Sequence, residues 1–169
     1  PFYPGPEQLL NMIDSAKINV FGTSAKYISS LEASGIIPSD ISDFNSLNTI
    51  LSTGSPLVDN NYSFVYQKWK SNVQLSSISG GTDIVSCFAL GSPITPVYSG
   101  ELQTRGLGMA VKSYNDNGEN LINSKGELVC DIPFPSMPVY FINDPKNEKY
   151  KKAYFSKFNN VWSHGDYIK

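Results

Sequence analysis

The chain has 169 residues, 40% of them hydrophobic, and a formal net charge of −2 at pH 7. This length and apolar content favour a packed globular protein, and the small net charge gives no electrostatic basis for binding nucleic acid or an anionic membrane. No apolar run approaches the roughly 20 residues that span a bilayer, and Cys87 and Cys130 are too few for a disulfide framework or a metal site, so a reducing cytoplasm is the expected location.

The first half of the chain alternates predicted helices with predicted strands. Pro6 precedes an apolar stripe, and Ser24 and Gly35 are residue types that begin and end helices. Helices are expected at residues 6–16, 24–35 and 58–70, and short strands at residues 18–21, 48–53 and 73–79. This alternation favours a parallel sheet covered by helices, because parallel strands need a crossover connection.

Each of these strands leads into small or hydroxyl-bearing residues. The three segments are Phe21-Gly22-Thr23, Gly54-Ser55-Pro56 and Gly80-Gly81-Thr82-Asp83. Ligands of open α/β sheets bind just outside the carboxyl ends of the strands. If the three strands are neighbours, these segments are therefore candidates for one binding site.

The third segment has the residue types of a phosphate-binding segment. Gly80 and Gly81 let the backbone approach a ligand and can point N–H groups at anionic oxygens. The Thr82 hydroxyl can donate to the same phosphate, and the Asp83 carboxylate can hold a hard cation such as Mg²⁺. The alternative is a plain glycine turn after a buried strand.

After about Pro93 the pattern changes to short β-rich runs. Strands are expected at residues 100–105, 108–114 and 126–132, with a hairpin turn at Asp116-Asn117-Gly118. A helix near residues 148–158 follows, whose aromatic residues Tyr150, Tyr154, Phe155 and Phe158 are interpreted as core. The runs together predict a small antiparallel lobe.

The last predicted strand, residues 161–168, carries two candidate polar residues. His164 is the only histidine, and without a serine or cysteine nucleophile motif we interpret it as a loop residue. Asp166 is suited to accept hydrogen bonds from both hydroxyls of a ribose, and the alternative is an aspartate that caps a turn.

The predicted fold class is α/β, with a partial parallel sheet and packed helices followed by a small antiparallel β lobe. We expect residues 1–92 to form the nucleotide- and acyl-binding part, 93–145 the antiparallel lobe, and 146–169 a helix and strand that return to the active-site edge. The abrupt start on proline leads us to expect a segment of a longer protein.

Six stretches in family order, spanning nearly the whole chain, resemble the adenylate-forming acyl-CoA synthetases, and among them most closely the acetoacetyl-CoA synthetases. They are residues 21–26, 50–57, 77–91, 105–111, 133–138 and 162–166. The resemblance implies that acetoacetate reacts with ATP to give acetoacetyl-AMP and pyrophosphate, and that coenzyme A then displaces AMP, a step of ketone-body and lipid metabolism. The expected partners are these small molecules, with no nucleic acid and no membrane.

The resemblance also implies roles for individual residues. Gly54-Ser55-Pro56 would lie along the adenine, Thr82 would bond the α-phosphate as the catalytic residue, and Asp166 would hold the ribose. Asp83 stands where many relatives have a glutamate that coordinates Mg²⁺, and its shorter side chain makes contact through water more secure. The remaining assignments are Phe21, Gly22, Thr23 and Gly80 for the acyl substrate, and Gly80 and Gly81 also for the nucleotide.

Two further expectations follow from the resemblance. Acetate-specific relatives have a tryptophan in the position of Gly80, so glycine there implies room for a longer acyl group. The phosphate loop of the family is expected upstream of residue 1, and the hinge and the adenylation lysine beyond residue 169, so the segment by itself is expected to be inactive. The alternatives are a ligase for another short or medium acyl acid and a non-catalytic nucleotide-binding or scaffold module.

Overall fold

The computed structural model describes residues 2–169, and these form two compact units. The first contains the chain up to Ser79 together with Leu90–Thr104, and the second contains Gly80–Ala89 and Arg105–Lys169. These units divide the chain differently from the three expected parts, because residues 90–104 return to the first unit and the final helix and strand share a core with residues 105–145. Pro1 lies outside the described residues.

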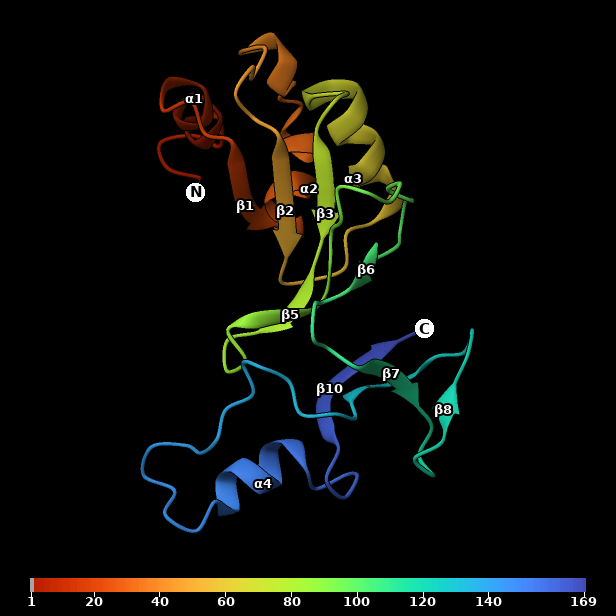
Figure 1. The fold of residues 1–169 in the computed structure, drawn as a ribbon. Helices are drawn as coiled ribbons and strands as arrows, with labels where there is room; N and C mark the ends of the chain where they lie inside the picture. The colour runs from red at the N-terminus through yellow and green to blue at the C-terminus, as the bar shows by residue number, and fades with distance from the viewer. Residues whose placement is uncertain (1) are drawn as a thin grey trace. The chain divides into compact units, whose positions relative to one another are not determined.

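The first unit contains the predicted parallel sheet. Strands β1 (Val20–Ser24), β2 (Thr49–Thr53) and β3 (Gln74–Ser77) lie in the order β1-β2-β3, and their arrows point the same way in Figure 1. The three strands are therefore neighbours, and their carboxyl ends share one edge, as the candidate site requires.

The first strand begins later than predicted. Val20 pairs with Thr49, and this register places Gly22 and Thr23 inside β1 rather than after it. The reason is that pairing starts at Asn19, whose carbonyl accepts hydrogen bonds from the backbone N–H groups of residues 48 and 49.

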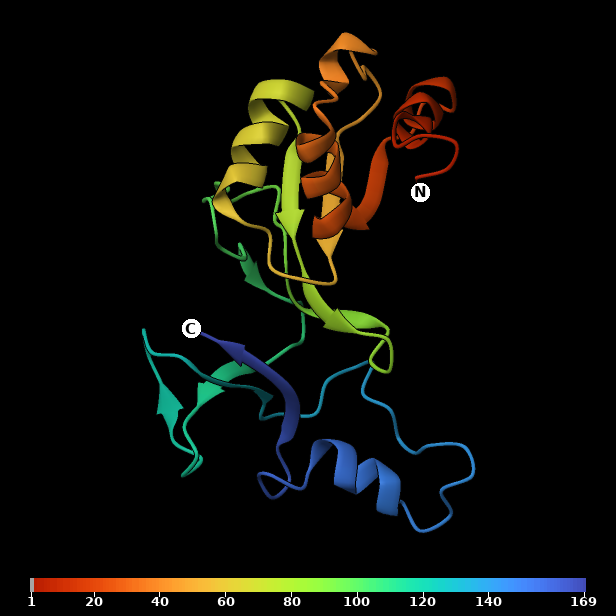
Figure 2. The same cartoon turned by 180° about the vertical axis from the view of Figure 1, so that it is seen from behind.

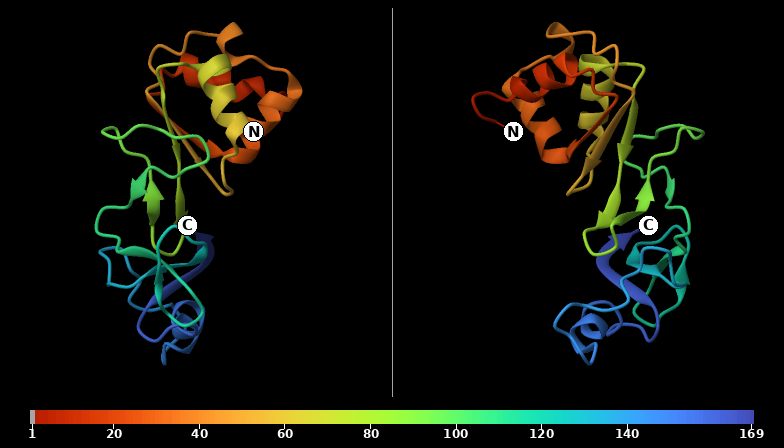
Figure 3. Two further views of the ribbon diagram at one scale, coloured as in Figure 1. Left: turned by 90° about the vertical axis from the view of Figure 1, so that its right-hand side faces the viewer. Right: turned by 60° about the vertical axis from the view of Figure 1, so that its left-hand side comes forward.

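Helices cover one face of this sheet. They are α1 (Glu7–Ser15), α2 (Ala25–Ser34), a 3₁₀ turn η1 (Pro38–Asp40), and α3 (Asp59–Phe64), which continues as a π-helical turn η2 (Val65–Trp69). Figures 2 and 3 show α2 and α3 together on the same side of the strands. Ser24 begins α2 as predicted, because its Oγ accepts a hydrogen bond from the Tyr27 N–H at 3.2 Å, and Gly35 ends it at φ +72°.

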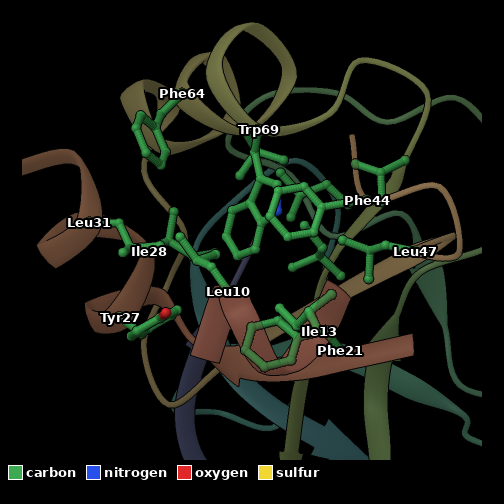
Figure 4. Close-up of a cluster of buried hydrophobic side chains, with 14 of the residues drawn as sticks. Leu10, Ile13, Phe21, Tyr27, Ile28, Leu31, Phe44, Leu47, Phe64 and Trp69 are labelled. Carbon is green, nitrogen blue, oxygen red and sulfur yellow. The ribbon is translucent and has the colours of Figure 1, made fainter. Parts of the chain in front are cut away.

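The core of the first unit lies between these helices and the sheet (Figure 4). Trp69 from η2 is at its centre, with its ring centroid 6.1 Å from that of Phe21 on β1 and 6.2 Å from that of Phe44. Ile28 and Leu31 of α2 are fully buried against the same cluster. Burial of this apolar stripe supplies the main stabilisation of the unit.

A small three-stranded sheet contains residues from the segments 79–90 and 104–105. Its strands β4 (Ser79–Gly81), β5 (Ser86–Leu90) and β6 (Thr104–Arg105) lie in the order β4-β5-β6. The prediction that Gly80 and Gly81 form a loop is therefore wrong, because both lie in β4 and the turn follows them at residues 82–85. The strand expected at residues 100–105 is reduced to its last two residues.

The second unit is the predicted antiparallel lobe, joined by the final helix and strand. Its sheet has the order β10-β9-β7-β8, with the strands β7 (Val111–Tyr114), β8 (Asn120–Leu121), β9 (Gly126–Cys130) and β10 (Trp162–Ile168). Helix α4 (Glu148–Tyr154) packs against β10 and is shorter than predicted, since the backbone leaves the helical conformation at Phe155. None of the helices within residues 2–169 has the length and hydrophobicity needed to cross a membrane.

Candidate functional site

The predicted site residues divide between the two units. Phe21-Gly22-Thr23 and Gly54-Ser55-Pro56 belong to the first unit, whereas Gly80-Gly81-Thr82-Asp83 and Asp166 belong to the second. In the first unit Thr23 pairs with Ser52, two residues before Gly54, so both segments lie at the carboxyl edge of the sheet. The structure therefore brings the two first-unit segments together at one sheet edge, and in the second unit it places Gly81, Thr82 and Asp83 beside His164, two residues before Asp166.

The residues of β1 do not all face the same environment. Phe21 is buried in the core, where its ring meets Tyr27 and Trp69. A Cβ added at Gly22 would meet no atom within 4 Å, and the same holds at Gly54, whose φ of +85° favours glycine. The backbone is thus open to a ligand at Gly22 and Gly54, while the acyl contact predicted for Phe21 stays a prediction.

A row of hydroxyls at this edge escaped the sequence analysis. Thr23, Ser52 and Ser77 are partners across β1, β2 and β3, so their side chains share one face of the sheet. Ser52 is fully buried, and its Oγ has no hydrogen-bond partner among the described residues. A hydroxyl residue at the same level of all three strands is the signal that could have identified the row.

In the second unit the predicted phosphate-binding segment lines a hollow of about 170 Å³. Gly81, Thr82 and Asp83 line it from one segment of the chain, and His164 lines it from β10. Its remaining lining residues are Ile84, Tyr154 and Trp162. The structure thus places Thr82 and Asp83 beside a concave space, as a binding role requires.

A tight turn presents Thr82 and Asp83. The Thr82 carbonyl accepts a hydrogen bond from the Val85 N–H at 3.2 Å, and Val85 adopts a left-handed φ of +48°. Ile84 is fully buried and anchors the turn in the core, while Asp83 is exposed. The turn is therefore fixed at its base and offers its polar side chains outward.

The two glycines of β4 permit close packing. A Cβ at Gly80 would lie 2.3 Å from the Ser86 carbonyl oxygen and 3.0 Å from the Cys87 Cα, which are backbone atoms that cannot move aside easily. A Cβ at Gly81 would lie 2.8 Å from Cε1 of His164. The approach of β5 explains glycine at position 80, and the acyl-pocket role of Gly80 stays a prediction.

Tyr154 connects the turn to the aromatic core. Its hydroxyl donates a hydrogen bond to Oδ2 of Asp83, and its ring stacks on Trp162 with centroids 3.6 Å apart. Burial, followed by the hydrogen bond and charge of Asp83, raises the pKa of Tyr154 to about 12. The hydroxyl therefore remains a neutral donor at physiological pH.

His164 lies within β10, so its interpretation as a loop residue is wrong. The strand continues through it because the pairing of β10 with β9 resumes at Tyr167 after an irregularity. The His164 ring packs edge-on against Phe88 at 4.7 Å, and its Nδ1 is buried without a hydrogen-bond partner among the described residues.

Asp166 is held near His164 by a distortion of the strand. Gly165 has φ +91°, and Nε2 of His164 lies 3.7 Å from Oδ2 of Asp166. The Asp166 side chain is 62% exposed, so its carboxylate is accessible to a ligand. The predicted ribose-binding role thus has a compatible geometry and stays a prediction.

Glu127 fixes this distortion and was missed in the sequence. Its buried carboxylate accepts a hydrogen bond from the Gly165 N–H at 2.8 Å and pairs with Lys157 at 3.0 Å. The hydrogen bond with Glu127 is the main cause that raises the pKa of Lys157. A buried acidic residue near the start of β9 therefore determines how β10 presents Asp166.

Asp144 anchors the helix that carries Tyr154. It is buried, and its Oδ2 accepts a hydrogen bond from the Tyr150 N–H at 2.9 Å. Burial alone would raise the pKa of the Asp144 carboxyl, but hydrogen bonds from the N–H groups of residues 148–150 lower it below its usual value. The ionised carboxylate is thus favoured in the folded state.

We expect Asp144→Asn to destabilise the second unit at neutral pH, with a difference from wild type that shrinks in acid. Because the folded pKa of Asp144 is lowered, its contribution is present above the ordinary aspartate pKa of about 3.9 and is lost as the pH falls through the lowered value. Denaturant midpoints measured from pH 7 to pH 3 test this. Asp43→Asn removes an exposed carboxylate and serves as the control. If the difference in denaturant midpoint between wild type and Asp144→Asn does not change with pH, the lowered pKa of Asp144 is contradicted.

Asp83 is the residue that could hold a cation. No three histidine, cysteine, aspartate or glutamate side chains gather as a metal site within residues 2–169, so protein ligands alone do not complete one. Mg²⁺ commonly takes one or two carboxylates together with substrate phosphates. A single carboxylate beside a hollow fits that mode of binding, with the second oxygen of Asp83 as the available ligand.

Comparison with known proteins gives whole-chain matches. The chain is 53% identical over 167 residues to an acetoacetyl-coenzyme A synthetase of Rhizobium meliloti, and 51% identical over 170 residues to an acetoacetyl-CoA synthetase of Gallus gallus. These matches cover 99% and 100% of the chain but 26% and 25% of the relatives. The chain therefore spans about a quarter of the length of the curated relatives that it matches. No family model matches it.

Solved structures agree with the sequence matches. The structure of acetoacetyl-CoA synthetase from Streptomyces lividans superposes on the whole chain with a TM-score of 0.92 at 35% identity, which is 27% of that protein. An anthranilate CoA ligase in complex with anthranoyl-AMP superposes on 96% of the chain, and the chain covers 29% of that ligase. Its TM-score is 0.78 at 16% identity, and it supports the fold alone. The predicted α/β fold class and the predicted resemblance are confirmed.

Proposed function

We propose that this chain is part of an acetoacetate–CoA ligase of the AMP-forming type. The observation that carries the proposal is the identity of about one half to acetoacetyl-CoA synthetases over the whole chain. Because the matched region is about a quarter of those relatives, the activity is proposed for the complete protein. The scaffold alternative is less favoured, since the chain keeps Thr82, Asp83 and Asp166 in an accessible arrangement.

In the proposed reaction acetoacetate attacks the α-phosphate of ATP, which gives acetoacetyl-AMP and pyrophosphate. The thiol of coenzyme A then displaces AMP to give acetoacetyl-CoA. Thr82 would donate its hydroxyl to the α-phosphate, where negative charge develops in the transition state. Asp166 would accept hydrogen bonds from the ribose hydroxyls, and Gly54-Ser55-Pro56 would lie along the adenine.

A bound Mg²⁺ would neutralise charge on the phosphate oxygens, and Asp83 is the residue proposed to hold it. The available Asp83 oxygen and the adjoining hollow support this role. A cytoplasmic location is also proposed, and the reduced state of Cys87 and Cys130 is compatible with it. Burial raises the pKa of both thiols, so they stay protonated at neutral pH.

Pyrophosphate release by the full-length protein tests the proposal. With ATP, Mg²⁺ and coenzyme A present, we expect turnover with acetoacetate to exceed turnover with acetate or butyrate. Preference for butyrate would favour the ligase for another short acyl acid. Absence of any acid-dependent release would overturn the ligase assignment and favour a nucleotide-binding module. Substitution of Gly80 is unsuitable as a specificity test, because an added Cβ would meet the backbone of β5.

A further inference from the structure

Tyr154 combines two environments in one side chain. It is the last residue of α4, and the sequence suggests only a core role for it. The ring does pack in the aromatic cluster of the second unit, but the hydroxyl leaves that cluster and donates to the Asp83 carboxylate. The two residues are 71 positions apart in the chain, so this contact is a product of the fold.

The ring of Tyr154 is held in a fixed position. It is nearly parallel to the ring of Trp162, with an interplanar angle of 13°, and Trp162 is 1% exposed. The Phe141 ring meets Tyr154 edge-on at a centroid distance of 6.1 Å. Contacts on both the face and the edge restrict rotation of the ring, so the hydroxyl is presented at a constant place.

The side chain of Asp83, in contrast, is little restricted by the residues next to it on the turn. It lies on an exposed turn, and a short side chain on such a turn has several accessible rotamers. The hydrogen bond from Tyr154 occupies Oδ2 and leaves Oδ1 for another ligand. Partners of this kind, which hold a carboxylate while its other oxygen binds a cation, orient many metal sites.

We propose that Tyr154 is a positioning residue that holds the Asp83 carboxylate ready to bind a divalent cation carried by the nucleotide. The inference rests on the metal role in the proposed function. The hydroxyl of Tyr154 makes no step of the reaction itself. Its hydrogen bond restricts the rotamers of the Asp83 side chain before the cation binds.

The test uses the full-length protein and direct measurement of cation binding. Mn²⁺ replaces Mg²⁺ as a paramagnetic probe, and its binding is followed by electron paramagnetic resonance in the presence of adenosine 5′-(α,β-methylene)triphosphate. Tyr154→Phe removes the hydroxyl and keeps the stacked ring. Tyr150→Phe is the matched control, because Tyr150 lies on the same helix and its hydroxyl donates to the Pro138 carbonyl instead of to Asp83.

We expect Tyr154→Phe to weaken Mn²⁺ binding by about tenfold, and Asp83→Asn to weaken it at least as much. Tyr150→Phe should stay within about twofold of wild type on the same scale. In pyrophosphate release, Tyr154→Phe should raise the Mg²⁺ concentration required for half-maximal rate more than it lowers the rate at saturating Mg²⁺.

Three results would overturn the inference. They are unchanged or tighter Mn²⁺ binding in Tyr154→Phe, an equal loss in both tyrosine variants, and unchanged binding in Asp83→Asn. Tighter binding would mean that Tyr154 competes with the cation for Asp83. The proposed function is tested separately. If the wild type shows no acetoacetate-dependent pyrophosphate release, the proposed function fails, but the Mn²⁺ binding of the variants can still be compared.

Discussion

Thr82→Val is expected to slow acetoacetate-dependent pyrophosphate release by the full-length protein by about a hundredfold or more. Valine has nearly the same shape but lacks the hydroxyl, and loss of one donor to developing charge commonly costs this much. Thr82 is exposed, and its carbonyl, not its side chain, closes the turn with Val85, so the turn should persist in the variant. The loss should therefore appear mainly in kcat.

Thr82→Ser is the matched control for this prediction. Serine keeps the hydroxyl and removes only a methyl group, so its rate should remain within about tenfold of wild type, well above that of Thr82→Val. Equal rates for valine and serine would show that the hydroxyl is not used. Unchanged thermal unfolding of both variants would confirm that the rates report on chemistry.

Trp162→Ala is expected to lower the free energy of unfolding by about 3–5 kcal/mol, the usual cost of truncating a large buried aromatic side chain. Trp162 is 1% exposed, and its ring meets five aromatic neighbours that alanine cannot replace. These neighbours are Phe88, Phe134, Tyr150, Tyr154 and Phe155. Urea unfolding curves of the variant and the wild type give the measurement.

Tyr167→Ala provides the control on the same strand. Tyr167 is 63% exposed, and its ring contact is an exposed one with Lys125, whose Nζ lies 4.9 Å from the ring centroid. Exposed cation–π contacts contribute about 0.5–1 kcal/mol, so this variant should remain close to wild type. Equal destabilisation by the two substitutions would contradict the stabilising role assigned to the buried ring of Trp162.

Local patterns predicted much of the first unit. Ser24 and Gly35 bound α2 as expected, because capping depends on neighbouring residues, and the alternation of strands and helices correctly predicted a parallel sheet. The sequence also singled out Thr82 and Asp83 as candidate site residues, and the structure places both beside a hollow. Their catalytic and metal roles remain predictions.

The missed contacts join distant parts of the chain. The bond from Tyr154 to Asp83 and the bond from Gly165 to Glu127 arise from packing, which no local pattern contains. Gly80 shows a second limit. A glycine in a sequence is compatible either with space for a ligand or with close approach of another strand, and only the position of Ser86 separates the two.

The core of each unit contains one tryptophan, Trp69 in the first and Trp162 in the second, and the chain has no others. Each indole therefore provides a separate fluorescent reporter without any added dye. In a Trp69→Phe variant of the 169-residue chain, emission comes from Trp162 alone and follows the unit that carries Thr82 and Asp83. In a Trp162→Phe background, emission follows the unit that carries the parallel sheet, so ligand effects can be assigned to one unit at a time.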